Sequence, residues 1–186
     1  LDASFNPGTA ASNGGDVNEI LVLPDGKIIV AGAFNYFNGL AKNNIVKLLA
    51  TGELDTSFEG AVPNAYLNAV ALQADGKLVA GGNTGKRIHR FNEDGSVDAS
   101  FNTGAGFDAQ VHSLAIQSDG KILIGGFFTS FDGSAAKGII RLNSDGTRDT
   151  SFDMGSGFFY SANNIPSISE IKVLDDGKIL VAGRFV

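Results

Sequence analysis

The feature that most constrains this chain is an internal repeat. The tripeptide Asp-Gly-Lys occurs four times, at separations of 50, 44 and 57 residues, beginning at Asp25, Asp75, Asp119 and Asp176. A second marker, Asp-x-Ser-Phe, recurs in step with it at separations of 53, 43 and 51 residues, beginning at Asp2, Asp55, Asp98 and Asp149. Two independent markers in step predict four copies of one structural unit.

Each copy predicts a β-hairpin around its Asp-Gly-Lys. Apolar residues stand five and three positions before the Asp, for example Leu114 and Ile116, which is the period of a strand. A nearly continuous β-branched run follows the turn, as in residues 121–126, and indicates a strand buried on both faces. Asp-Gly between two such runs predicts a type I′ turn, in which both central residues have positive φ.

Further strands follow the hairpin. A third strand is predicted at residues 44–49, 86–91 and 138–142, and it leads into a second turn at residues 92–96 or 143–147. The Asp-x-Ser-Phe segment after that turn is a candidate fourth strand. No segment shows the 3.6-residue period of an amphipathic helix. Each unit is therefore expected to be an antiparallel meander of three or four strands.

A repeated meander of this length predicts an all-β protein, a β-propeller or propeller fragment of about four antiparallel four-stranded blades. The expected organisation is a single repeat domain over residues 1–186, with units at 1–53, 54–96, 97–147 and an incomplete 148–186. We expect this domain to be part of a longer chain. An open solenoid is the structural alternative.

The third copy carries the fullest set of motifs, at residues 97–101, 117–128 and 140–146, and it resembles the delta-60 repeat, a bacterial propeller-like repeat. The resemblance covers nearly the whole chain, although the second copy departs from the pattern between Gly82 and Ile88. It implies a scaffold or binding module of a large exported protein, and hence a secreted or cell-surface location. The family carries no established catalytic residues to transfer to this chain.

Composition excludes several classes of function. The absence of Cys excludes disulfides and thiolate chemistry, and the net charge of −6 argues against binding to a nucleic-acid backbone. No apolar run approaches the length that a membrane-spanning helix needs, so we expect no membrane insertion.

Metal binding and catalysis find little support. When residues 90–101 are superposed on a calcium-binding loop, the first ligand position falls on Arg90 and the last on Phe101, which suits calcium poorly. His89 and His112 lack the spacing of a zinc site. The repeated Asp-x-Ser-Phe carboxylates are more simply explained as turn or blade-closing groups than as a glycosidase pair. We expect no cofactor, no metal and no enzymatic activity, and we expect the Asp-Gly-Lys lysines to be solvated.

The connections between strands separate two rims. Both kinds of Asp-Gly turn lie on one rim, the turn rim, whereas the connections from strand two to strand three and from unit to unit lie on the other, the variable rim. Function concentrates on variable loops that a rigid scaffold holds. The Phe-x-x-Phe-x-Gly motif on the variable rim is either an aromatic platform or packing between blades, and its repetition favours packing.

The candidate binding residues lie on the variable rim. The insertion at residues 155–164 is not shared by the other copies, and it supplies Phe158, Phe159, Tyr160, Asn163 and Asn164; Tyr36 and Phe127 complete the set. The favoured function is a non-catalytic scaffold that contacts a protein or cell-surface partner. A carbohydrate-binding propeller that uses these aromatic loops is the alternative, and an enzymatic propeller is the weakest hypothesis.

Overall fold

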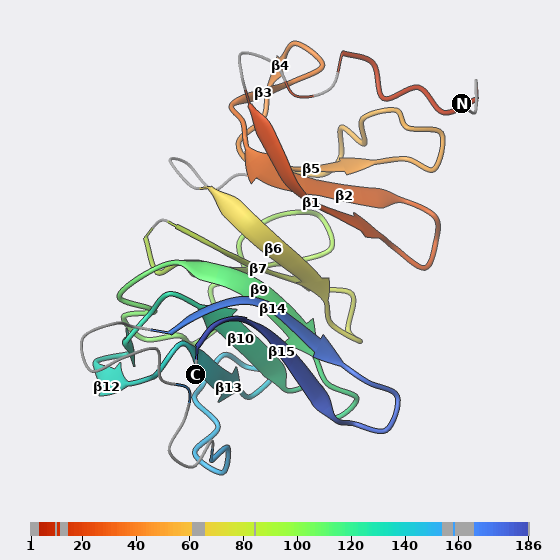
Figure 1. Ribbon diagram of the computed structural model, residues 1–186. Helices are drawn as coiled ribbons and strands as arrows, with labels where there is room; N and C mark the ends of the chain where they lie inside the picture. Colours follow the sequence, from red (N-terminus) through yellow and green to blue (C-terminus); the bar gives the residue numbers. More distant parts are fainter. Residues whose placement is uncertain are drawn as a thin grey trace.

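The structure is a computed structural model that describes residues 4–9, 11, 15–60, 66–83, 85–153, 158 and 166–185. The described residues form strands and no helices, and every strand pair is antiparallel (Figure 1). Sheet 1 contains β1 (Asp16–Val22), β2 (Ile28–Ala33) and β5 (Ile45–Leu48). Sheet 2 contains β6 (Leu67–Leu72), β7 (Leu78–Gly82) and β8 (Ile88–Phe91).

Sheet 3 contains β9 (Val111–Ile116), β10 (Ile122–Gly126) and β13 (Ile139–Leu142), and sheet 4 contains β14 (Ser167–Val173) and β15 (Ile179–Arg184). Two small hairpins project from the strand-two to strand-three connections. They are β3 (Tyr36–Phe37) with β4 (Leu40–Ala41), and β11 (Ser130–Phe131) with β12 (Ser134–Ala135).

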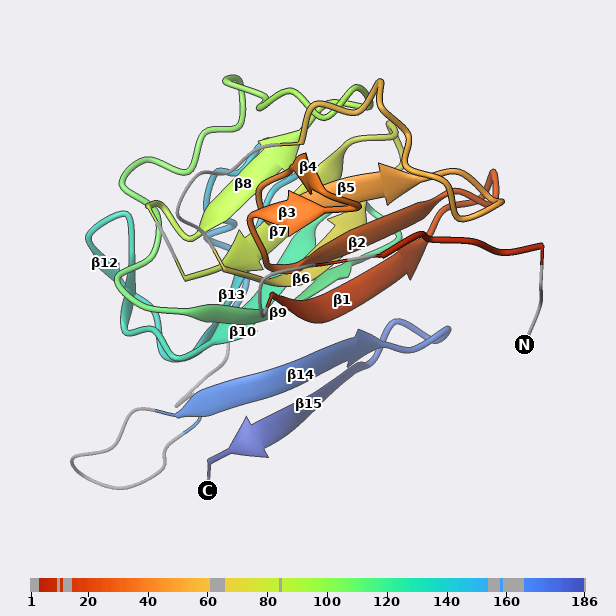
Figure 2. The same ribbon diagram turned by 90° about the horizontal axis from the view of Figure 1, so that it is seen from above.

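The four sheets follow one another around the first strand of each. β1 contacts β6, β6 contacts β9, and β9 contacts β14, so the first strands lie side by side in chain order (Figures 1 and 2). The fourth strand is reduced to an isolated bridge, Leu48 with Leu54, Phe91 with Val97, and Leu142 with Arg148. The prediction of repeated antiparallel meanders is therefore confirmed, with the Asp-x-Ser-Phe segment attached to the sheet that precedes it.

The predicted turn type at Asp-Gly-Lys is wrong. The backbone N–H of Leu23 donates to the carbonyl of Lys27, and that of Gly26 to the carbonyl of Leu23, so three residues rather than two form the loop. Gly26 has a φ of 81°, but Asp25 is not among the residues with positive φ. This geometry is a type I turn followed by a left-handed glycine, which needs glycine at one position only.

True two-residue type I′ loops occur instead in the Phe-x-x-Phe-x-Gly connections. Asn38 and Gly39 have φ values of 51° and 74°, and Asp132 and Gly133 have values of 47° and 71°. Each pair joins two strands of two residues, β3 to β4 and β11 to β12. The sequence analysis did not predict these hairpins.

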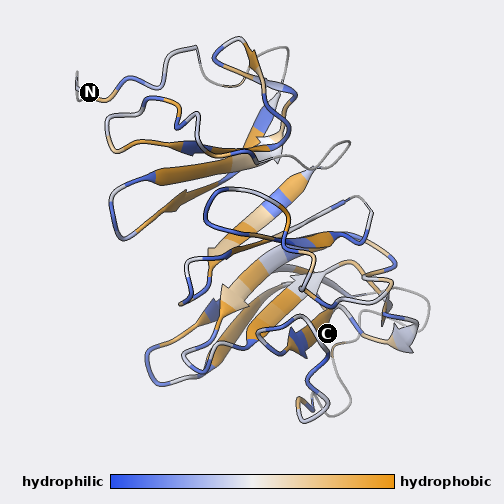
Figure 3. Ribbon diagram, turned by 180° about the vertical axis from the view of Figure 1, so that it is seen from behind, coloured by the Kyte–Doolittle hydropathy of each residue, from blue (hydrophilic) through white to orange (hydrophobic). Residues whose placement is uncertain are grey.

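Strand two is the buried centre of each inner sheet, as the sequence predicts. All five residues of β7 and all five of β10 are buried. Figure 3 shows hydrophobic residues along these strands and hydrophilic residues in the turns. Glycine is needed at Gly125 because a Cβ there would lie 2.5 Å from a methyl carbon of Ile168 on sheet 4. The absent side chain thus lets neighbouring sheets approach closely.

Polar side chains join the first strands at their β-bulges. Asn18 donates its amide to the carbonyl of Leu67 at 2.9 Å, and Asn68 donates to that of Val111 at 2.8 Å. His112 takes the same place on β9 and hydrogen-bonds the backbone of Ile168. These three side chains satisfy carbonyls at successive sheet boundaries, so His112 has a structural role.

Candidate functional site

The repeated Asp and Lys residues of the turn rim pair in sheets 1, 2 and 3, and in sheets 2 and 3 an Arg joins them to form an ion cluster. In sheet 2, the Asp98 carboxylate accepts from Lys77 Nζ at 2.7 Å and from Arg90 Nη2 at 2.9 Å. Its other oxygen accepts from the Ser100 hydroxyl at 2.6 Å and the Ser100 N–H at 2.9 Å. The hydrogen bonds from Lys77 and then Ser100 hold the pKa of Asp98 well below its usual range.

The expectation that the Asp-Gly-Lys lysines are solvated is wrong for three of the four copies. Lys27, Lys77 and Lys121 pair with Asp55, Asp98 and Asp149 at 3.5, 2.7 and 2.9 Å. These pairs tie the hairpin turn to the segment that carries the fourth-strand bridge. Lys178 contacts its own turn residue, Asp176.

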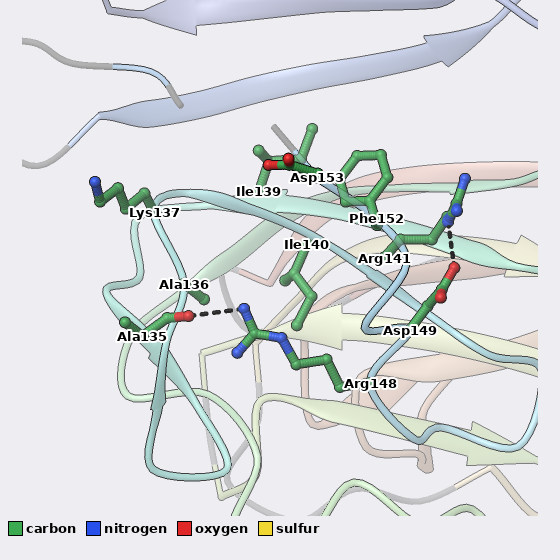
Figure 4. A pocket seen from close by; sticks show the side chains of 10 residues that line it. All are labelled: Ala135, Ala136, Lys137, Ile139, Ile140, Arg141, Arg148, Asp149, Phe152 and Asp153. Atoms are coloured by element: carbon green, nitrogen blue, oxygen red, sulfur yellow. Dashed lines mark hydrogen bonds and ion pairs between the residues drawn. The ribbon is translucent and has the colours of Figure 1, made fainter. Parts of the chain in front are cut away.

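The same cluster recurs in sheet 3, where Figure 4 shows Arg141 pointing at Asp149 beside Phe152. Arg141 Nε lies 2.7 Å from the Asp149 carboxylate, and the guanidinium carbon is 4.8 Å from the Phe152 ring centroid. Asp149 thus stands in a setting equivalent to that of Asp98. The arrangement closes the sheet, as expected from the sequence.

Backbone hydrogen bonds from the residue after the Asp-x-Ser-Phe segment join sheet 1 to sheet 2 and sheet 2 to sheet 3. The N–H of Glu59 donates to the carbonyl of Asp94 at 2.8 Å, and that of Asn102 donates to the carbonyl of Asp145 at 2.8 Å. Near the start of the chain, Asn6 makes the equivalent bond to Thr51 at 2.9 Å. Both markers of the repeat are therefore occupied in building the fold.

The phenylalanines of the Phe-x-x-Phe-x-Gly motif are structural. Phe34, Phe37, Phe128 and Phe131 are all buried. Phe107 packs between two of them, with ring centroids 4.5 Å from Phe128 and 4.7 Å from Phe131. Burial confirms the packing interpretation and removes these rings from the set of contact residues.

The predicted site residues have different outcomes. Phe158 is half-buried and packs on Phe185 with a centroid distance of 4.4 Å, which indicates local packing. Phe159, Tyr160, Asn163 and Asn164 lie outside the described residues, so their role stays a prediction. Tyr36 and Phe127 are each 42% exposed on the variable rim.

The structure adds two residues that the sequence analysis missed. Tyr66 precedes β6 and is 57% exposed, and Leu40 on the β3–β4 hairpin is 51% exposed. Tyr66 hydrogen-bonds through its backbone carbonyl to the N–H of Asn83, so its ring projects from a fixed point of the variable rim. The signal available in the sequence was that no other copy has an aromatic residue there, the equivalents being Asp16, Gln110 and Ser167.

Within the described ranges, no group of three or more His, Cys, Asp and Glu residues is arranged to hold a metal ion. The same ranges contain no helix of the length and hydrophobicity needed to cross a membrane.

A family model described as "Domain of unknown function (DUF5122) beta-propeller" matches residues 23–58, 73–101 and 117–152, more than half of the chain. This chain belongs to the DUF5122 β-propeller family. Each of the three matched segments runs from an Asp-Gly-Lys turn to the following Asp-x-Ser-Phe segment. These two parts are the ones that the Lys–Asp ion pairs join. No curated protein matches the sequence.

Solved structures support the propeller fold of this DUF5122 chain. The WD40 β-propeller domain of Doa1 superposes with a TM-score of 0.63 at 17% identity, covering 93% of this chain and 49% of that one. Virginiamycin B lyase from Staphylococcus aureus gives 0.59 at 17% identity, covering 88% of this chain and 47% of the lyase.

The extracellular domain of a putative one component system from B. thetaiotaomicron gives a TM-score of 0.58 at 14% identity, covering 97% of this chain and 22% of that one. The DUF5122 chain thus spans half or less of each of these three structures. At such low identity, the likeness concerns the fold alone.

Proposed function

We propose that this chain is a non-catalytic interaction module, built of delta-60 repeat units, of an exported or cell-surface bacterial protein. Its variable rim contacts a protein partner. The observation that carries the proposal is the exposure of Tyr36, Leu40, Tyr66 and Phe127 on that rim.

These exposed side chains stand where packing does not require an apolar residue. Phe127 is exposed, whereas the adjacent Phe128 is fully buried, and Ala33 takes the place of Phe127 in sheet 1. Ser130 and Ser134 stand on β11 and β12 where Tyr36 and Leu40 stand on β3 and β4. Aromatic residues are enriched in the centres of protein interfaces, which favours a binding role for residues that the fold itself does not need.

The repeated charged groups support a non-catalytic role. Asp55, Asp98 and Asp149 each pair with the lysine of their own Asp-Gly-Lys turn and each has a lowered pKa, whereas general acid–base chemistry uses carboxyl groups whose pKa values are shifted apart. The extracellular domain among the similar structures is consistent with an exported parent protein.

Site-specific photo-crosslinking in the producing cells tests this proposal. A photoreactive amino acid replaces Tyr66 or Phe127 on the variable rim, with Ser118 as the control because it is exposed on the Asp-Gly-Lys turn of sheet 3. We expect both rim positions to capture one and the same protein and Ser118 to capture none. Equal capture from Ser118, or no common protein from the rim, would refute the proposal.

A glycan array separates the carbohydrate-binding alternative. The wild-type chain is compared with Tyr66→Ser/Phe127→Ser, and circular dichroism checks that both are folded. Glycan binding by the wild type that is lost in the variant would show that the ligand is a carbohydrate and not a protein. A blank array together with a rim crosslink supports the protein partner.

A further inference from the structure

A cleft of about 700 Å³ opens on the turn rim between sheets 1 and 2. Its apolar lining includes Leu23, Leu72 and Leu78, and its polar lining includes Asp55, Glu93 and Asp94. It lies at the opposite end of the sheets from the variable rim, so it is not part of the surface proposed above.

The boundary between sheets 2 and 3, which we call a seam, shows which chemical group fits at the position equivalent to the cleft. Between sheets 2 and 3, the Arg90 guanidinium donates to the carbonyl of Ser144 at 2.6 Å and pairs with Asp98 at 2.9 Å. It lies 4.7 Å from the centroid of the Phe101 ring. Gln73 donates to the same Ser144 carbonyl at 3.2 Å. A guanidinium thus closes this seam from within the chain.

Two substitutions change that closure between sheets 1 and 2. Lys47 stands on β5 where Arg90 stands on β8, and Leu23 stands where Gln73 does. Lys47 Nζ reaches the Glu93 carbonyl at 2.7 Å and lies 4.8 Å from the Phe58 ring centroid. It therefore reproduces two contacts of Arg90, to the backbone and to the aromatic ring.

Lys47 does not reproduce the third contact of Arg90, which is the ion pair with a carboxylate. Among the described residues, the ion pair of Asp55 is with Lys27 at 3.5 Å, whereas Asp98 pairs with both Lys77 and Arg90 at 2.7 and 2.9 Å. The Asp55 side chain is only 10% exposed, and it lines the cleft. Ser57, the equivalent of Ser100, also lines the cleft.

We propose that the cleft between sheets 1 and 2 binds the guanidinium of an arginine side chain presented by a partner protein. The guanidinium pairs with Asp55 and shares it with Lys27, as Arg90 shares Asp98 with Lys77. The aliphatic part of the arginine covers Leu23 and Leu72. Charge favours this ligand, because four carboxylates line the cleft (Asp25, Asp55, Glu93 and Asp94) against two lysines (Lys27 and Lys47).

The test is an NMR titration of the ¹⁵N-labelled chain with Nα-acetyl-arginine amide at low ionic strength. The matched control is Nα-acetyl-citrulline amide, which has the same shape but no charge. We expect saturable shifts of the Ser57 and Glu93 amides with the arginine probe, and an affinity for citrulline at least about tenfold weaker, because a charge-assisted hydrogen bond is lost. Equal shifts with both probes, or none with arginine, would overturn the proposal.

Two paired variants locate the site. Leu23→Gln/Lys47→Arg supplies the missing guanidinium from within the chain, so it should abolish the shifts while leaving the protein folded. Gln73→Leu/Arg90→Lys opens the neighbouring seam, so it should create new shifts at Ser100 and Ser144. Unchanged binding by the first variant, or no new site in the second while its spectrum stays folded, would contradict the inference.

The rim variant keeps this proposal separate from the proposed function. Tyr66→Ser/Phe127→Ser should bind the arginine probe as the wild type does, since neither residue lines the cleft. A loss of probe binding in this variant would contradict the assignment of the cleft.

Discussion

Replacing Asp98 by Asn tests whether the ion clusters stabilise the fold. Asp98 is largely buried, with 8% of its side chain exposed, and it accepts from Lys77, Arg90 and Ser100. The amide keeps the shape but loses the charge, which leaves the Arg90 guanidinium, itself 7% exposed, without its carboxylate. Breaking a buried pair on one side costs about 3–5 kcal/mol.

We expect the lower end of that range, about 3 kcal/mol, because Arg90 keeps the Ser144 carbonyl and Lys77 can turn to solvent. For a domain of this size the loss lowers Tm by about 6–12 °C. The measurement is urea and thermal unfolding followed by circular dichroism. Asp75→Asn is the matched control, because within the described residues Asp75 accepts only the exposed turn N–H of Lys77, at 3.2 Å.

The pH dependence of the difference in unfolding free energy between wild type and Asp98→Asn gives a second readout. The pKa of Asp98 is lowered by folding, so its stabilising contribution is present above the unfolded pKa and is lost as the pH falls below about 4. The gap in unfolding free energy between wild type and Asp98→Asn should therefore narrow in acid. A variant as stable as Asp75→Asn at neutral pH, or a gap that widens in acid, would refute the reasoning.

Three further predictions concern packing, backbone and pH. Phe128→Ala should cost about 3–5 kcal/mol, since Phe128 is fully buried, whereas the adjacent Phe127→Ala should change the unfolding free energy by less than about 0.5 kcal/mol. Gly95→Ala should destabilise more than Gly120→Ala in chemical denaturation: both have positive φ, but a Cβ at Gly95 would lie 2.6 Å from a backbone nitrogen, against 3.9 Å to the nearest atom at Gly120. Burial lowers the pKa of His112, so wild-type stability should fall as the pH drops below about 6.5. The variant His112→Asn, which introduces the residue that sheets 1 and 2 have at this position, should remove that part of the pH dependence. An unchanged pH profile of stability in the variant would count against this prediction.

The strands were predictable because their signal is local. The spacing around Asp-Gly-Lys places the residues of β9 and β10, and the third strands β5, β8 and β13 fall within two residues of the predicted ones. The turn type was not predictable from Asp-Gly alone, since it depends on whether Lys27 pairs with Pro24 or, as observed, with Leu23. One residue of register separates a type I′ loop from the observed three-residue loop.

The ion clusters and the exposed rings were harder to find for different reasons. Lys27 and Asp55 are 28 positions apart, and only the meander brings the hairpin turn beside the fourth-strand segment. Tyr66 carries no periodic signal, because a single aromatic before a strand is equally compatible with the core and the surface. Its exposure depends on which way the strand enters the sheet.

The distribution of roles across the repeat indicates where function resides. Positions shared by the copies are used by the fold: Asp98 closes a sheet, Phe101 packs under Arg90, and Gly95 lets the preceding segment approach. A residue free to bind a partner must therefore stand where the copies differ. Sheet 1 differs on both rims, with Lys47 and Leu23 in its seam to sheet 2 and with an exposed apolar pair on its β3–β4 hairpin. We accordingly expect partner contacts to involve sheet 1 on both rims, and binding that survives changes at both of its rims would show that the divergence of this copy has another cause.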